Sequence, residues 1–203
     1  MIKYIVIALV LGVVTGYLNN NFGNFFANSY VSDYLFNFSL VLLLFVMGFS
    51  FGFDKEATLK LKKAGLKILV VPFAVALGSI LGGFVGGLIL GINVFASMAV
   101  SAGFGWYTLA GPLVGQLFGA EFGALGLTVN FLRELLTITT ISLTVRIDKY
   151  VPIAFGGATT MDTTLPVIVR YCGSEALITA FSSGFALSLT APFAITAIAT
   201  LFH

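Results

Sequence analysis

The sequence is poor in charge, in cysteine and in histidine. Only 9% of its 203 residues are charged, against about 25% in an average soluble domain. Hydrophobic residues make up 59%, and the mean hydropathy is +1.07. The one cysteine, Cys172, excludes an internal disulfide, and the one histidine, His203, is the last residue. This composition predicts an integral membrane protein in which residues 1–203 form a single polytopic membrane domain.

The motifs of catalysis are absent as well. No metal-ligand spacing, nucleophile motif or phosphate-binding loop occurs, so we expect neither an enzyme nor a bound metal or cofactor. The net charge of +2 is small, and five of the ten basic residues lie in the loop 54–67. A lysine-rich loop between apolar runs indicates membrane topology rather than a nucleic-acid site.

Long apolar runs account for most of the chain. About 20 helical residues cross a hydrocarbon core of about 30 Å. Spanning helices are expected over residues 5–18, 34–53, 68–90, 121–145 and 176–202. The first run resembles a signal peptide but lacks a convincing cleavage site, so we expect it to be retained. Pro192 is expected to kink the last helix.

Two further apolar segments, on either side of the fourth span, are interrupted by small residues and prolines. An unbroken helix is not expected there, because glycine and proline weaken helices and expose backbone groups. The residues expected at the two breaks are Gly103, Gly105 and Pro112 in the first segment and Gly156, Gly157 and Pro166 in the second. Matching interrupted segments in two halves of a chain are typical of transporter binding sites.

The two broken segments belong to an internal repeat. A shift of 54 residues superposes Pro112 on Pro166, and each broken segment precedes one long helix. If the segments cross the membrane the units are parallel, whereas re-entrant hairpins make them inverted. Only the inverted arrangement places Arg146, Lys149 and Arg170 in the cytoplasm with the lysine loop, as positive-inside asymmetry favours. The expected fold is therefore an all-α integral membrane protein with about five transmembrane helices and two re-entrant hairpins.

Three ionisable residues lie deep in these segments. A charge at the bilayer centre costs several kcal/mol, so such residues are candidates for function. Glu134 and Arg133 lie near the middle of the fourth span, and Asp162 lies at the second break. Arg133 alternatively braces a hairpin or caps exposed carbonyls, and Asp162 alternatively caps the following half-helix.

Polar and aromatic side chains surround these charges. Asn130 and Thr137 share a helical face with Glu134. This spacing predicts a polar stripe that faces the hairpins. Trp106 and Tyr107 either attract an ammonium group through their rings or simply pack. The candidates for substrate or proton binding are Glu134, Asp162, Arg133, Asn130, Trp106, Tyr107, Thr108, Thr160 and Thr163.

At these residues the sequence resembles the bacterial and archaeal lysine exporter family LysO. The matching runs are Ser-Ala-Gly-Phe-Gly-Trp-Tyr at 101–107, Phe-Leu-Arg-Glu-Leu-Leu at 131–136 and Gly-Ala-Thr-Thr-Met-Asp-Thr-Thr-Leu-Pro at 157–166. The resemblance implies export of L-lysine and analogues such as thialysine from the cytoplasm, with Glu134 and Asp162 required. Longer members carry additional N-terminal helices, which implies a homodimer or a partner membrane subunit for this chain.

Physical chemistry agrees with a lysine substrate. A carboxylate could hold the side-chain ammonium, while Arg133 or the half-helix N-termini take the substrate carboxylate. Export of net positive charge opposes an inside-negative potential, so coupling is expected, most simply to protons. The expected location is the prokaryotic plasma membrane, in contact with lipid. Two alternatives are a carboxylate or sodium-coupled exchanger and an accessory subunit without transport of its own.

Overall fold

The protein was analysed as a computed structural model, which describes residues 69–201 without a gap. Before them it describes residues 7, 10–15, 17, 18, 34, 35, 38, 39, 41, 42, 45, 46, 49 and 53. The chain divides into two compact units, Met1–Thr58 and Leu59–His203. In the first unit every described residue is helical, in agreement with the spans expected at 5–18 and 34–53. The remainder of those spans and the lysine loop lie outside the described residues.

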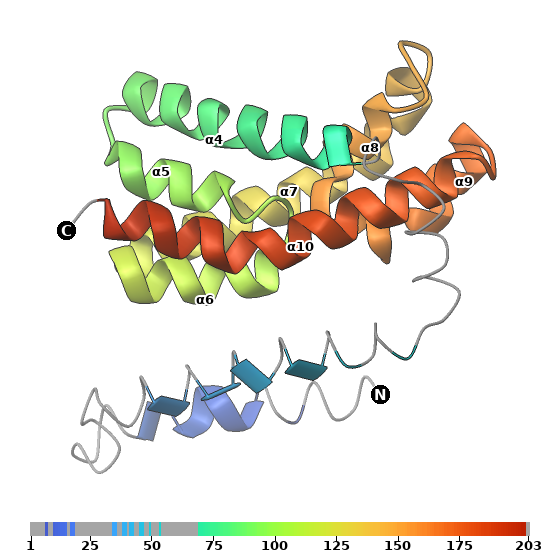
Figure 1. Cartoon of the computed structure of the whole chain (residues 1–203). Coiled ribbons are helices and arrows are strands. Elements are labelled where there is room, and N and C mark those ends of the chain that lie inside the picture. Colours follow the sequence, from blue (N-terminus) through green and yellow to red (C-terminus); the bar gives the residue numbers. More distant parts are fainter. Residues whose placement is uncertain are drawn as a thin grey trace. The chain divides into compact units, whose positions relative to one another are not determined.

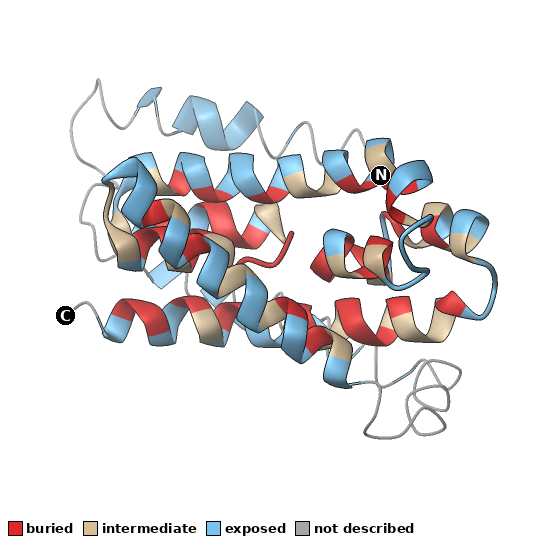
Figure 2. Cartoon of the chain, turned by 90° about the horizontal axis from the view of Figure 1, so that it is seen from above, coloured by how far each residue is buried: buried red, intermediate tan, exposed pale blue. Residues whose placement is uncertain are grey.

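Three long apolar helices form the frame of the second unit (Figure 1). They are α4 (Val70–Leu90), α7 (Ala120–Thr144) and α10 (Ala176–Thr200). Each is long and apolar enough to cross a membrane, and their bounds lie within two residues of the predicted spans. Because the surrounding solvent is lipid, many large apolar residues of these helices are exposed. Figure 2 shows that buried and exposed residues alternate along the helices.

The first broken segment is a re-entrant hairpin made of α5 (Val94–Ser101) and α6 (Tyr107–Phe118). Helix α5 returns along α4, where an added Cβ on Gly83 would meet Ser101 and one on Gly87 would meet Ser97. Helix α6 runs antiparallel to the first half of α7, with Gly115 against Gly123. The chain therefore turns at residues 102–106 and goes back toward the end at which α5 began. We call this segment hairpin 1.

The second broken segment contains α8 (Val151–Gly156), the 3-10 helix η2 (Gly157–Met161) and α9 (Leu165–Cys172). Its two ends lie side by side, because Lys149 before α8 and Glu175 after α9 form an ion pair of 3.3 Å. We call this segment hairpin 2. It follows the end of α7 and precedes the start of α10, so both of its ends lie at the same end of the bundle. A buried cluster holds it there: Ile141, Ile153, Ile168, Ala176 and Ala180.

The two hairpins point toward each other from opposite ends of the bundle (Figure 1). The predicted repeat is visible in the backbone, since Gly119 ends α6 with φ 101° and ψ 160° and Gly173 ends α9 with φ 87° and ψ 163°. The N–H of each glycine bonds to a carbonyl four residues earlier, Gly115 and Val169 respectively. The expected all-α fold with inverted, re-entrant hairpins is confirmed for the part of the chain that the structure describes.

Candidate functional site

The tips of the two hairpins meet in the interior of the bundle. The N–H of Ala158 in hairpin 2 donates to the carbonyl of Phe104 in hairpin 1 over 2.8 Å. These two residues are 54 positions apart, so equivalent points of the repeat contact each other. Gly157 has φ 61°, and an added Cβ there would collide with the Phe104 carbonyl oxygen. The expected glycines therefore allow the two backbones to approach closely.

Asn130 of α7 holds hairpin 1. Its side-chain oxygen accepts the N–H of Gly105 at 2.7 Å, and its amide nitrogen donates to the carbonyls of Val100 and Gly126 at 2.9 and 2.8 Å. Gly105 has φ 107°, and the Asn130 side chain is only 2% exposed. Without this amide, the broken backbone would leave buried polar groups unpaired.

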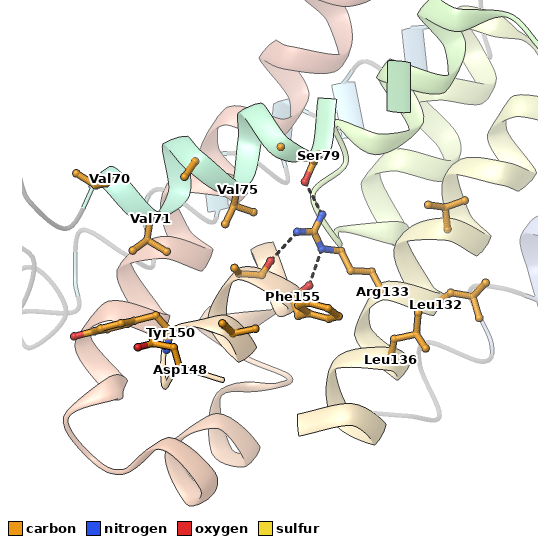
Figure 3. Close-up of a pocket in the computed structure, with 15 residues that line it drawn as sticks. Val70, Val71, Val75, Ser79, Leu132, Arg133, Leu136, Asp148, Tyr150 and Phe155 are labelled. Carbon is orange, nitrogen blue, oxygen red and sulfur yellow. Dashed lines mark hydrogen bonds between the residues drawn. The ribbon is translucent and has the colours of Figure 1, made fainter. Parts of the chain in front are cut away.

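Arg133, one turn further along α7, holds hairpin 2 (Figure 3). Its Nε and one terminal nitrogen donate to the carbonyls of Phe155 and Ala154 at 2.7 and 2.9 Å. The other terminal nitrogen donates to Ser79 Oγ of α4 at 2.9 Å. These carbonyls belong to the last turn of α8, where no helical partner is available. The structure thus has the bracing geometry that the sequence left as an alternative.

Glu134 and Asp162 lie close to a shared neighbour, Tyr107. The Tyr107 hydroxyl lies close enough to the Glu134 carboxyl group, and near enough to Asp162, to interact with both acidic side chains. The second carboxyl oxygen of Glu134 is buried and has no hydrogen-bond partner among the described residues. A buried oxygen that accepts no bond carries a desolvation cost that a cationic ligand or a proton would relieve.

Asp162 does not cap the following helix, so that interpretation was wrong. Its carboxylate accepts the N–H of Thr163 at 2.6 Å, whereas the first residue before α9 is Thr164 and no side chain caps that helix. The Thr163 N–H lies too early in the chain to be one of the orphan donors of α9. Asp162 is exposed at the end of η2, which leaves its other oxygen accessible.

The remaining candidates divide into structural and accessible side chains. Thr160 is fully buried, and its hydroxyl is shared between the carbonyls of Gly157 and Ala180 at 2.8 and 2.7 Å. Trp106 is half-buried immediately before α6, and Thr108 and Thr163 are exposed. Thr137 bonds to the carbonyl of Arg133 within its own helix. Asn130 is thus the member of the predicted polar stripe that bonds to a hairpin tip.

Two features of the site escaped sequence reasoning. Ser79 carried no signal as a partner of Arg133, because it lies on a different helix 54 residues away. Met161 and Ser188 form a contact of 3.6 Å between sulfur and hydroxyl oxygen. These two positions are the repeat equivalents of Tyr107 and Glu134, so the shift of 54 residues would have identified them.

An open apolar groove of 1040 Å³ lies between α4, α7 and α8, beside the arginine clamp rather than at the carboxylates (Figure 3). Arg133 and Ser79 form the polar part of its wall, and Asp148 and Tyr150 line it near the end of the bundle. Its lining is otherwise mostly aliphatic, which suits lipid or a neighbouring helix better than a charged solute. No group of three or more potential metal ligands occurs among the described residues.

Basic residues gather at the end of the bundle where hairpin 2 opens. Arg146, Lys149 and Arg170 are all exposed, and α4 begins at this end, since Val71 packs against the cluster beneath hairpin 2. The hydrogen bond to Glu175 raises the pKa of Lys149, with Tyr150 and Asp148 contributing through their charges. Positive charge on one side of a membrane protein favours the cytoplasm for that side.

Comparison with known proteins gives one family. The family model of the lysine exporter LysO matches residues 6–199. The lysine exporter LysO of Escherichia coli K12 is 34% identical over 135 residues, which are 66% of this chain and 45% of that protein. A provisionally named lysine exporter of Haemophilus influenzae is 30% identical over 132 residues, which are 65% of this chain and 66% of that protein. No solved structure matches the chain.

Proposed function

Because the chain belongs to the lysine exporter LysO family, we propose that it is a secondary transporter that exports L-lysine, and analogues such as thialysine, from the cytoplasm. The observation that carries the proposal is the pair of carboxylates at the meeting point of two hairpins that open at opposite ends of the bundle. Glu134 has an unpartnered oxygen there, and Asp162 shares its neighbour Tyr107. The cell location that fits is the prokaryotic plasma membrane.

Each part of lysine has a suitable partner at this point. Glu134 and Asp162 would hold the side-chain ammonium, with Trp106 and Tyr107 adding ring attraction for a cation. The substrate carboxylate would lie at the N-terminus of α6, which no side chain caps. Thr108 and Thr163 are exposed near this position and would supply hydroxyl contacts.

Proton antiport is the proposed coupling. Moving one positive charge outward against an inside-negative potential costs about 2.3 kcal/mol per 100 mV. A carboxylate that alternately binds lysine and a proton couples the two flows, because the protonated acid no longer attracts the ammonium. The protein would then act as a transporter without catalysis or cofactor. Lysine binding would release protons and would weaken as the pH falls.

Two other functions remain as candidates. In a sodium-coupled carboxylate exchanger, Arg133 and the α6 dipole would bind the anion and the acidic residues the sodium ion. In an accessory subunit, the chain would act only with a second membrane protein. The aligned part covers 45% of the E. coli relative. Under lysine export itself, a homodimer or a partner membrane subunit is the proposed assembly.

Counterflow of labelled lysine in proteoliposomes tests the proposal. With the purified chain, we expect labelled lysine to enter lysine-loaded vesicles. A proton gradient directed opposite to the lysine flow should accelerate this transport, and sodium should not affect it. Excess citrate should not compete. Citrate competition with sodium dependence would favour the exchanger. Absence of any amino-acid movement, with tight binding of a second membrane protein, would favour the accessory subunit.

A further inference from the structure

We infer that Arg133 is a positioning residue that fixes the spacing of Glu134 and Asp162 by clamping hairpin 2 to α4 and α7, and that it is not the ligand of the substrate carboxylate. The inference rests on the proposed function, which supplies the substrate. It assigns to this arginine a role different from the one that its charge alone suggests.

The guanidinium group is already engaged on three sides. All three of its nitrogens donate, to the carbonyls of Phe155 and Ala154 and to the hydroxyl of Ser79, over 2.7 to 2.9 Å. A substrate carboxylate that bound side-on would have to displace both α8 carbonyls, because that bidentate mode uses Nε together with a terminal nitrogen. Displacement would leave the last carbonyls of α8 without a donor inside the bundle.

The clamp touches both hairpin tips. An added Cβ on Gly157 would lie 3.1 Å from Arg133 Cζ and Nε, and one on Gly105 would lie 3.6 Å from Arg133 Cδ. The aliphatic part of the Arg133 side chain therefore lies next to the hydrogen bond between the Ala158 N–H and the Phe104 carbonyl. The side chain holds the carboxyl end of α8, and η2 follows α8 directly and ends at Asp162.

Consequently Arg133 determines how far Asp162 lies from Glu134. Glu134 is the next residue of α7, so its position is fixed by the same helix that carries the arginine. Asp162 follows η2, whose first residue, Gly157, lies against the arginine and whose Thr160 bonds to the Ala180 carbonyl of α10. Loss of the clamp would let hairpin 2 move while hairpin 1 stays bound to Asn130. The effect on transport would come from the spacing of the carboxylates.

A labelling experiment tests the clamp without any transport assay. Thr164, in hairpin 2, is fully buried and of nearly the size of cysteine. In a Cys172→Ser background, we expect Thr164→Cys to react slowly with N-ethylmaleimide, and Arg133→Gln to raise that rate at least tenfold, equivalent to about 1.4 kcal/mol. Ser79→Ala should act in the same direction with a smaller change, and Arg146→Gln, an exposed arginine, should leave the rate unchanged.

Competition experiments separate positioning from direct binding. Lysinamide keeps both amines of lysine and lacks the carboxylate. If Arg133 positions hairpin 2, Arg133→Gln should weaken inhibition of lysine counterflow by lysine and by lysinamide to the same degree, and Arg133→Lys should restore part of it. A selective loss for lysine, with an unchanged labelling rate of Thr164→Cys, would overturn the inference. If the parent protein moved no lysine, the proposed function would fail while the labelling rates would still decide whether the clamp exists.

Discussion

Hairpin 1 and hairpin 2 follow similar backbone paths, but the side chains at equivalent positions differ in their chemistry. Tyr107 contacts Glu134 in the first half of the repeat, and the equivalent Met161 contacts Ser188 in the second half. Asn130 binds hairpin 1 through two hydrogen bonds, to Gly105 and Val100. Its equivalent, Gly184, allows α10 to approach η2 so closely that an added Cβ would lie 2.5 Å from Met161 N. The inverted repeat thus conserves geometry without conserving charge.

This difference assigns separate tasks to the two long helices. Helix α7 provides the side chains that hold both tips, Asn130 for hairpin 1 and Arg133 for hairpin 2, and it also carries Glu134. Helix α10 provides small residues, and its Gly184 packs closely against η2. A symmetric scaffold with an asymmetric set of charges can open toward either side of the membrane while it keeps one binding site.

The largest expected effect concerns the sides on which the hairpins open. In a Cys172→Ser background, Asp148→Cys should be protected from an impermeant maleimide in intact cells and labelled after permeabilisation. Glu121→Cys, at the opposite end of α7, should be labelled from outside without permeabilisation. Both positions are exposed, so burial does not account for protection. Labelling of Asp148→Cys from outside, with Glu121→Cys protected, would contradict re-entrant hairpins and favour full crossings.

Loss of a carboxylate at Glu134 or Asp162 should reduce lysine transport far more than the loss of a polar group at an equivalent or exposed position. Removing one partner of a buried charge pair costs about 2–5 kcal/mol, so we expect Glu134→Gln and Asp162→Asn each to lower lysine counterflow at least about thirtyfold. Ser188→Ala, at the repeat equivalent of Glu134, and the exposed Glu175→Gln serve as matched controls with normal counterflow. Parental rates for both acidic-site variants, at equal amounts of folded protein, would refute the site.

A smaller effect separates close approach from backbone strain among the glycines. Gly157 and Gly119 both have positive φ, but an added Cβ meets other atoms only at Gly157. Gly119→Ala should therefore cost about 1–3 kcal/mol from backbone strain alone, because almost only glycine adopts its φ of 101° with ψ of 160°. Gly157→Ala should lower the thermal midpoint of the detergent-solubilised protein clearly more, because it also separates the tips. Equal midpoints for the two variants would mean that the tips do not touch.

The smallest effect is expected at the end of hairpin 2. The hydrogen bond to Glu175 raises the pKa of Lys149, so its contribution to stability is present at pH values below the ordinary lysine pKa of about 10.4. It is lost as the pH rises through the raised pKa of the folded state. Lys149→Gln should thus lower the thermal midpoint slightly and by a constant amount from pH 6 to 9. A difference that vanished within that range would contradict the assignment.

Several features of the fold could be predicted because they depend on local sequence. Glycine weakens a helix wherever it occurs, so the breaks at 103–105 and 156–157 were found. Pro112, also expected at the first break, lies inside α6 instead. The clustering of lysine in the loop 54–67 favoured re-entrant hairpins over full crossings. For Asp162 only the alternative of a helix cap was wrong, because its carboxylate accepts the N–H of Thr163 and no side chain caps α9. Its binding role stays a prediction.

Residue patterns along the chain determined the membrane class, the two breaks, the repeat and the depth of Glu134, Arg133 and Asp162, because hydrophobic length and helix-breaking residues act locally. Only the tertiary structure decided which charge is engaged and which is free. Arg133 binds α4 and α8, while Glu134 beside it keeps an unpartnered oxygen. Adjacent helical residues point about 100° apart, so their partners depend on which elements the fold brings to each face.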